Sequence, residues 1–203
     1  MSAVQETTGS TFTGDDWYGR DLADGRFVDC AFREVDLTEA RSHGAVFEQC
    51  RFDGCWLNVS EHQGTAFVGC AFKGTSLFGA VLDGCKLMGT TFDRCVLRPL
   101  TVTGGLWRGV VLTGADLSGV ELRQVRLQDA DLSAAVLRGC DLRGADLTAA
   151  LVEGADLSGA DLRGASLLGV DLAQATLRGT RVDLAGGVAV AESRGVRVEL
   201  PDD

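Results

Sequence analysis

Seven cysteines are the residues of this chain whose chemistry would best suit redox reactions or metal binding. Their positions differ by multiples of five, and none forms a C-x-x-C pair: Cys30, Cys50, Cys55, Cys70, Cys85, Cys95 and Cys140. A reactive cysteine needs surroundings that favour the thiolate, whereas a buried cysteine behaves as a small apolar side chain. The regular spacing favours packing, so we predict no metal site and no reactive thiol.

His62 and Ser42 are the next candidates, because an imidazole can act as a general base or a metal ligand. They lie twenty residues apart and are the two polar members of an otherwise apolar series. A buried imidazole must find hydrogen-bond partners, and a neighbouring hydroxyl can supply one. We predict that Ser42 and His62 form an inward-facing polar pair with no catalytic role.

A third candidate is a phosphate-binding loop, since Gly79 and Gly84 precede Lys86. The Gly-Lys-Ser/Thr ending of such loops is missing, and a glycine at every fifth position produces the G-x-x-x-x-G spacing automatically. The sequence contains no nucleophile elbow and no zinc-ligand spacing. We therefore predict that the protein is not an enzyme and binds no cofactor.

Charged residues recur at twenty-residue intervals in the second half of the chain. One row is acidic and its neighbour is basic: Glu121, Asp141 and Asp161, beside Arg123, Arg143 and Arg163. Two interpretations remain open: a solvated face with ion pairs of little net worth, or carboxylates presented to a protein groove built for DNA phosphates. The candidates for the second interpretation are Glu121, Asp141, Asp156 and Asp161.

The element that must position these residues is a five-residue repeat. From Phe12 to Val182, every fifth residue is apolar at all but two of 35 positions. The residue two places after each of these centres is glycine at 21 of 34 sites. An α-helix repeats every ~3.6 residues and a β-strand every ~2, so this period fits neither element and indicates a solenoid.

The repeat resembles the pentapeptide-repeat family, whose A-(D/N)-L-x-G pattern stands here as Ala115-Asp116-Leu117-Ser118-Gly119 and Ala155-Asp156-Leu157-Ser158-Gly159. The resemblance implies an all-β fold, a right-handed quadrilateral parallel β-helix of about eight coils with four repeats in each. Phenylalanines twenty residues apart agree with that coil length. We expect them to stack in two ladders: Phe12, Phe32, Phe52, Phe72 and Phe92, and Phe27, Phe47 and Phe67.

The composition restricts the class of partner. The chain has 29 acidic and 19 basic residues, a formal charge of −10. Nucleic-acid-binding and anionic-membrane surfaces need clustered positive charge, so we predict no nucleic-acid and no membrane partner and favour a basic protein. No apolar run is long enough to cross a bilayer, and the first ten residues lack a signal pattern, so we expect a cytoplasmic location.

The two ends of the chain depart from the repeat. We divide it into a flexible N-terminus (1–10), the β-helix (11–183) and a capping or dimerisation segment (184–203). Within the last segment the pattern predicts a short helix over 183–195 and a strand over 196–200. An open solenoid end exposes apolar side chains and strand edges, so the tail must cap it or join two rods through a two-fold contact. Candidate dimer residues are Val188, Val190, Val196, Val198 and Leu200.

Further features resemble the gyrase-interacting, quinolone-resistance members of the pentapeptide-repeat family. No surface loop interrupts the repeat, Glu61-His62-Gln63-Gly64 lies near the start, and Cys95-Val96-Leu97-Arg98-Pro99-Leu100-Thr101 lies at mid-chain. Pro99 lacks a backbone donor at a site where glycine is usual, and we expect a local kink there. The resemblance implies a homodimeric rod, joined at its C-terminal ends, that imitates duplex DNA, binds DNA gyrase, and inhibits it or protects it from quinolone-type drugs. The alternative is a scaffold for another protein partner, without catalysis.

Overall fold

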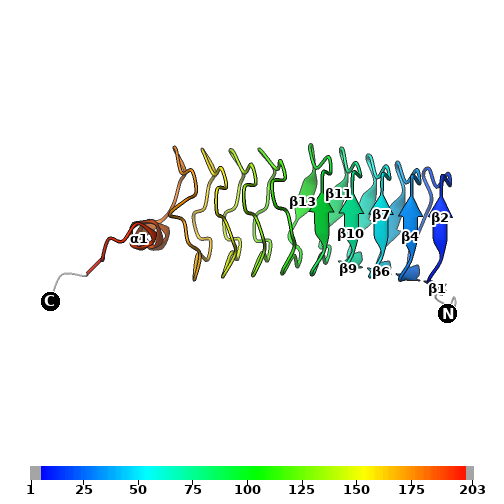
Figure 1. Cartoon of the computed structure of the whole chain (residues 1–203), viewed down its shortest axis with the longest axis horizontal. Helices are drawn as coiled ribbons and strands as arrows, with labels where there is room; N and C mark the ends of the chain where they lie inside the picture. Colours follow the sequence, from blue (N-terminus) through cyan, green and yellow to red (C-terminus); the bar gives the residue numbers. More distant parts are fainter. Residues whose placement is uncertain (1–5, 200–203) are drawn as a thin grey trace.

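The computed structural model describes residues 6–199 as a rod of stacked coils, with helix α1 at its C-terminal end (Figure 1). Each coil takes twenty residues, because β-pairing joins each residue to the one twenty positions later, as in Phe12 and Phe32. Parallel pairing in this register begins at Glu6 and continues to Arg181. The parallel β-solenoid predicted from the repeat is confirmed.

The coil has four sides, which we call faces A to D in chain order. Three faces carry parallel sheets of three-residue strands. Face A contains β1 (Glu6–Thr8), β3 (Arg26–Val28), β6 (Val46–Glu48) and β9 (Ala66–Val68). Face B contains β2 (Thr11–Thr13), β4 (Ala31–Arg33), β7 (Arg51–Asp53), β10 (Ala71–Lys73) and β12 (Thr91–Asp93). Face D contains β5 (Arg41–His43), β8 (Glu61–Gln63), β11 (Val81–Asp83) and β13 (Thr101–Thr103).

Face C is built from residues 15–19 and the segments that follow at twenty-residue intervals. It is held by isolated bridges in place of strands, such as those of Trp56 to Asp36 and to Ser76. The strands occupy roughly the first five coils, and beyond Thr103 isolated bridges carry the same register along the remaining coils. On all four faces, equivalent positions of successive coils therefore keep their side chains pointing inward or outward along the whole described rod.

The interior is filled by one large and one small side chain from each repeat. The predicted phenylalanine ladders are confirmed: the rings of Phe32 and Phe52 stack with centroids 4.6 Å apart, and those of Phe47 and Phe67 at 4.9 Å. Each fully buried phenylalanine contributes about 1.5–3 kcal/mol of transfer free energy. Small residues alternate with these rings because a second large side chain would not fit.

Glycine is favoured where the backbone turns from one face to the next. The residue two places after the centre has a positive φ in every repeat from Gly14 to Gly179 except at Pro99 and Gln174, and this conformation costs side-chain-bearing residues energy. Gly105 is a special case, with φ of 115° beside the large Trp107. A Cβ at Gly105 would lie 2.6 Å from the Cys85 carbonyl oxygen, so the bulk of Trp107 is accommodated by removing a side chain next to it.

The C-terminal end is covered by α1 (Leu184–Ser193), which agrees with the predicted helix. Asp183 caps it, since its Oδ1 accepts from the Gly186 amide at 2.9 Å and its Oδ2 from the Gly164 amide at 2.7 Å. The predicted strand is wrong for the described residues 196–199, which form none. The helix ends in a turn at Gly195, φ 77°, and no strand edge follows for pairing. Leu200 lies outside the described residues.

The N-terminal boundary also differs from the expected one. Pairing already begins with β1, which lies in the segment 1–10 that was expected to be flexible. Residues 1–5 lie outside the described residues. The pairing of β1 with β3 extends face A by one coil at this end.

Candidate protein-interaction surface

The inward polar cluster lies on face D and contains the two residues singled out by sequence. Ser42 and His62 occupy adjacent coils, and the Ser42 hydroxyl lies 2.7 Å from His62 Nδ1. The Thr65 hydroxyl lies 2.7 Å from that of Ser42, and the Ser60 hydroxyl 3.0 Å from His62 Nε2. All four side chains are buried. A substrate in solution cannot reach this imidazole, so the cluster stabilises the interior and offers no site for chemistry.

The direction of these hydrogen bonds follows from their outermost member. Ser60 donates its hydroxyl proton to the Leu57 carbonyl oxygen at 2.7 Å, so Ser60 can only accept from His62 Nε2–H. In the neutral ring, Nδ1 is then an acceptor for the Ser42 hydroxyl. Burial lowers the pKa of His62 to about 4, in keeping with a neutral ring.

The cysteines lie at the small inward position of their repeats. All seven thiols donate to the carbonyl oxygen 23 residues earlier, as Cys55 does to Phe32 at 3.4 Å. Burial raises the pKa of Cys55 to about 11 and that of Cys85 to about 12, so both stay protonated. Within residues 6–199, no three histidine, cysteine or acidic side chains are grouped so that they could hold a metal.

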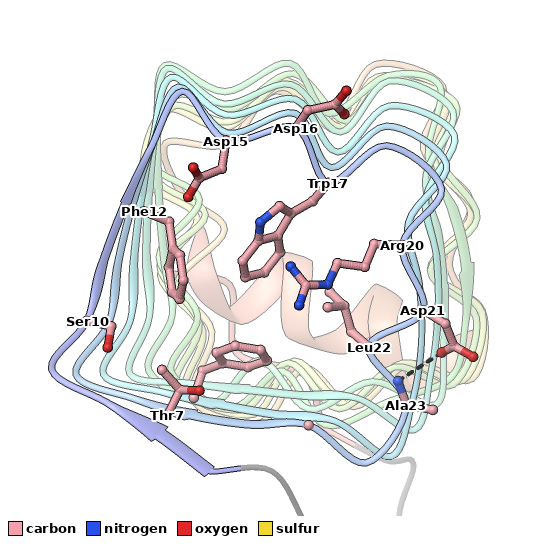
Figure 2. A pocket seen from close by; sticks show the side chains of 12 residues that line it. Thr7, Ser10, Phe12, Asp15, Asp16, Trp17, Arg20, Asp21, Leu22 and Ala23 are labelled. Carbon is pink, nitrogen blue, oxygen red and sulfur yellow. Dashed lines mark hydrogen bonds between the residues drawn. The ribbon is translucent and has the colours of Figure 1, made fainter.

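A cavity of about 490 Å³ opens at the N-terminal end of the described rod, beside its first described coil. Figure 2 shows Phe12, Trp17 and Leu22 pointing into this opening, with the guanidinium of Arg20 folded across it. The Arg20 guanidinium carbon lies 4.1 Å from the centroid of the Trp17 ring, and Trp17 is only 6% exposed. A cation–π contact therefore covers the first layer of the core, and the opening is the end of the solenoid.

The acidic row expected to face a partner lies mainly on face D. Glu121, Asp141 and Asp161 are paired in register along the rod. Asp141 is held by Arg143 at 2.8 Å and by Arg123 at 2.6 Å, and these guanidiniums keep its pKa well below the usual range. Arg163 lowers the pKa of Asp161 to about 2. The carboxylates of this row are thus largely neutralised by their own chain.

Asp156 lies on the neighbouring face C, and its carboxylate is also bound by other residues of the chain. The Ser158 hydroxyl and amide, together with Arg138, lower the pKa of Asp156 to about 2. The Arg138 side chain is 18 residues earlier, one coil toward the N-terminus. The same offset joins Arg98 to Asp116 and Arg123 to Asp141, so it is a regular feature of the C-terminal half.

On face C, two carboxylates without such partners lie toward the N-terminal end, and the sequence reasoning missed them. Asp36 and Glu39 form no ion pair with any lysine or arginine of the described chain. Asp36 accepts from the Thr38 amide at 2.9 Å through Oδ1. The Glu39 carboxylate raises the pKa of the neighbouring Tyr18. The signal was available, because neither the position two residues after Asp36 nor the one 18 before it holds an arginine.

The candidate dimer residues divide into two groups. Val190 packs with Val182 and Ala189 against the last layer of the core and so contributes to capping. Val188 lines a groove between α1 and the last coil, while Val196 and Val198 are exposed beyond the helix. Exposed apolar side chains also stand at this end on Leu168 and Leu184.

The backbone around Pro99 shows a local break in pairing. Face C carries bridges from Asp16 to Val96 and again from Asp116 to Thr176, but within the described rod no bridge joins Val96 to Asp116. A cavity of about 530 Å³ opens between the two coils at this point, lined in part by Pro99. In Figure 1 the coils on either side follow each other along one rod.

Comparison with known families and proteins identifies the type of repeat. The profile described as "Pentapeptide repeats" matches in eight copies over residues 26–58, 63–97, 108–144 and 140–179. The pentapeptide repeat protein MfpA of Mycolicibacterium smegmatis (strain ATCC 700084 / mc(2)155) is 39% identical over 56 residues, 28% of this chain and 29% of that protein. The Mycobacterium tuberculosis (strain ATCC 25618 / H37Rv) MfpA is 40% identical over 58 residues, 26% of this chain and 32% of that protein. The chain thus spans about three tenths of the length of the curated relatives it matches.

Solved structures extend the likeness over the whole rod. A trypsin-treated variant of QnrB1, described as a plasmid-mediated fluoroquinolone resistance protein, has a TM-score of 0.85 at 20% identity and covers 97% of this chain and 98% of that one. Full-length QnrB1 has a TM-score of 0.79 at 18% identity, over 94% and 100% of the two chains. At this identity the match establishes a common fold. No helix in residues 6–199 has the length and hydropathy of a membrane span.

Proposed function

Because the chain belongs to the pentapeptide-repeat family, we propose that it is a non-catalytic, DNA-shaped rod that binds DNA gyrase and alters its response to quinolone-type drugs. The observation that carries this proposal is the combination of an uninterrupted rod with an acidic outer surface. Its segments of similarity to MfpA and its fold likeness to a fluoroquinolone resistance protein support it. The proposed location is the cytoplasm, where gyrase acts.

The dimensions of the rod support mimicry of duplex DNA. Pairing from Glu6 to Arg181 at twenty residues per coil gives nearly nine coils. At about 4.8 Å per coil the rod is roughly 40 Å long. Duplex DNA of that length carries about 24 phosphate charges, at one per ~1.7 Å. The chain carries a net charge of −10, so it would present a diluted version of the DNA surface. Its negative charge disfavours a nucleic-acid or an anionic-membrane partner.

We further propose that two rods join at their C-terminal ends, with residues 11–183 forming each rod and 184–203 the joint. The exposure of Leu168, Leu184 and Val196 at this end supports the joint, because a second rod could bury these apolar side chains. A two-fold contact there would double the length of the rod. The proposed contact residues are Val188, Val190, Val196, Val198 and Leu200.

The proposal is tested with purified gyrase, by measuring supercoiling and ciprofloxacin-stabilised DNA cleavage across a titration of the protein. We expect concentration-dependent inhibition of supercoiling or reduced drug-dependent cleavage, and a marked loss of either effect as salt rises. If both reactions are unchanged at tens of micromolar protein, the gyrase proposal is wrong. The alternative, a scaffold for another protein partner, would then be favoured.

Sedimentation tests the joint separately. We expect the full chain to sediment as a dimer, and a Leu168→Glu, Leu184→Glu variant to sediment as a monomer without loss of helicity, because both side chains lie outside the core. A full chain that is monomeric at tens of micromolar would contradict the dimer and leave capping as the role of the tail.

A further inference from the structure

The N-terminal half of face C carries a cluster of exposed apolar side chains. Trp56, Val59, Phe78 and Val96, which we call the face C patch, are each between 45% and 52% exposed. They occupy three successive coils: bridges join Trp56 to Ser76 and Ser76 to Val96, and the Val59 amide donates to the Phe78 carbonyl oxygen at 2.8 Å. Isolated exposed apolar residues need no explanation, but a contiguous cluster marks an interaction site.

The backbone of Val59 is a second and independent observation. Val59 has a φ of 55°, in the left-handed region that β-branched residues rarely adopt. The equivalent position one coil farther along is occupied by Gly79, which adopts this conformation without strain. The Val59 side chain is exposed and fills no hole in the core. A strained residue whose side chain adds little to packing points to a role outside stability.

The charges beside the patch indicate the chemistry of its partner. Asp36 is paired in register with Trp56, and Glu39 lies one coil before Val59 in the same column. Both carboxylates are free of ion pairs within residues 6–199, as described above. Farther along the same face, Asp116 and Asp156 are neutralised by Arg98 and Arg138. Face C therefore offers free negative charge only beside the apolar patch and toward the N-terminal end of the described rod.

We propose that the face C patch, together with Asp36 and Glu39, is the surface on which the rod docks against a basic protein surface. Arginine side chains of that partner would stack on the exposed Trp56 ring and pair with the free carboxylates, while apolar side chains cover Phe78 and Val59. A second copy of this chain fits less well, because it would bring the same unpaired carboxylates to the contact. This inference rests on the proposed function, in which the partner is gyrase and the basic groups are those that bind DNA phosphates.

The first test compares apolar variants in the gyrase supercoiling assay. We expect Trp56→Ser with Phe78→Ser to raise the half-inhibitory concentration at least tenfold. The matched control is Leu151→Ser, whose side chain is 58% exposed on face B, and it should change the value less than twofold. Circular dichroism and thermal melting establish that each variant is folded, which is expected because these side chains project from the rod.

The second test separates charge from shape. Asp36→Asn with Glu39→Gln should weaken inhibition several-fold and reduce its salt dependence, because two of the charges that attract the basic partner are removed. The matched control is Glu153→Gln, which removes an exposed carboxylate on face B and should leave the inhibition and its salt dependence unchanged.

Val59→Gly gives a test that loss of stability cannot imitate. Glycine relieves the left-handed strain, so the melting temperature should rise by a few degrees. The same change removes an apolar contact, so inhibition of gyrase should weaken at least threefold. A variant that is more stable and yet binds less tightly would separate the role of Val59 from folding.

The outcomes distinguish this inference from the proposed function. If the unmodified protein inhibits gyrase and the patch variants inhibit it equally well, the inference is overturned and the proposed function stands. If the unmodified protein has no effect on gyrase, both fall. If the patch variants instead abolish self-association measured by sedimentation, a second copy occupies the patch and the inference is again overturned.

Discussion

The Nδ1 atom of His62 lies 2.7 Å from the hydroxyl oxygen of Ser42, its counterpart one coil earlier, in a part of the rod closed to solvent. The two residues share face D and the same inward position, where nearly every other repeat has an apolar side chain. Ser60 accepts from the other ring nitrogen, and burial lowers the pKa of the ring, so the neutral imidazole accepts the Ser42 proton at Nδ1. The pair therefore makes the stability of the rod depend on pH.

The first prediction concerns that dependence. The pKa of His62 is lowered from 6.5 to about 4, so the unfolded chain binds a proton in this range that the folded chain does not. Stability is therefore complete above about pH 7.5 and falls as pH decreases from 6.5 toward 4, by roughly 2 kcal/mol between pH 7.5 and 5. Urea unfolding at these pH values measures the change.

His62→Leu is the control for this prediction, because leucine is the commonest residue at the centre of the repeat. It removes the titrating group, so the free energy of unfolding should change little between pH 7.5 and 5, whatever the effect of the substitution on absolute stability. Asp141 and Asp161 do not disturb the comparison, since their lowered pKa values affect stability at more acidic pH. A profile equally steep in the variant would contradict the assignment to His62.

The second prediction compares two adjacent glycines. Gly105→Ala places a Cβ 2.6 Å from the Cys85 carbonyl oxygen at a φ of 115°, and should cost about 2 kcal/mol or more. Gly104→Ala has a φ of 58° and nothing within 4 Å, so it should cost only about 1 kcal/mol. Chemical denaturation of both variants checks the order, and equal losses would mean that the backbone at Cys85 and the Trp107 ring shift to admit the new methyl group.

The third prediction concerns the attachment of α1. Asp183→Ala removes the cap of the helix and its bond to Gly164, and should increase hydrogen exchange of the helix amides about five- to tenfold. Asp171→Ala is the matched control, because Asp171 accepts only from the nearby Ala173 amide. Exchange in α1 that is unchanged by Asp183→Ala would show that apolar packing alone holds the helix.

The fourth prediction is the order of thiol labelling. Burial raises the pKa of Cys55, Cys85 and Cys95, so their alkylation at pH 8 should be at least ~100-fold slower in the folded protein than in urea. Cys95 is only half-buried and should react first. Mass spectrometry of the labelled peptides identifies it, and Cys95→Ala should remove the fastest phase. Rapid labelling of fully buried Cys50 or Cys70 would reveal local opening of the coil.

Much of the interior was predictable because it repeats. An inward side chain such as Phe52 can meet only the residues one coil before and after it and those of the neighbouring faces. Once the repeat indicated twenty residues per coil, the stacking on Phe32 and Phe72 followed. The Ser42–His62 contact followed in the same way, since both stand at the centre of their repeats on one face.

The outer surface was less predictable because its side chains have a choice of partners. Asp141 lies within reach of Arg143 on its own coil and of Arg123 on the coil before, and it binds both. Long flexible side chains reach across faces and coils, so the same charge pattern allowed either a free acidic row or a neutralised one. The missing arginines around Asp36 became informative only once the structure showed which two offsets form ion pairs.

The sequence by itself thus determined the five-residue period, the four-sided coil, the residues of the core and the helix that follows Val182. Steric exclusion in a closed interior leaves each inward position one set of neighbours. The tertiary structure decided which carboxylates remain unpaired, where exposed apolar residues from three coils meet on face C, and that the residues after α1 form no strand within 196–199. Those features depend on which of several ion-pair partners each surface side chain contacts. The alternative pairings are close in energy, so only the folded structure shows which of them form.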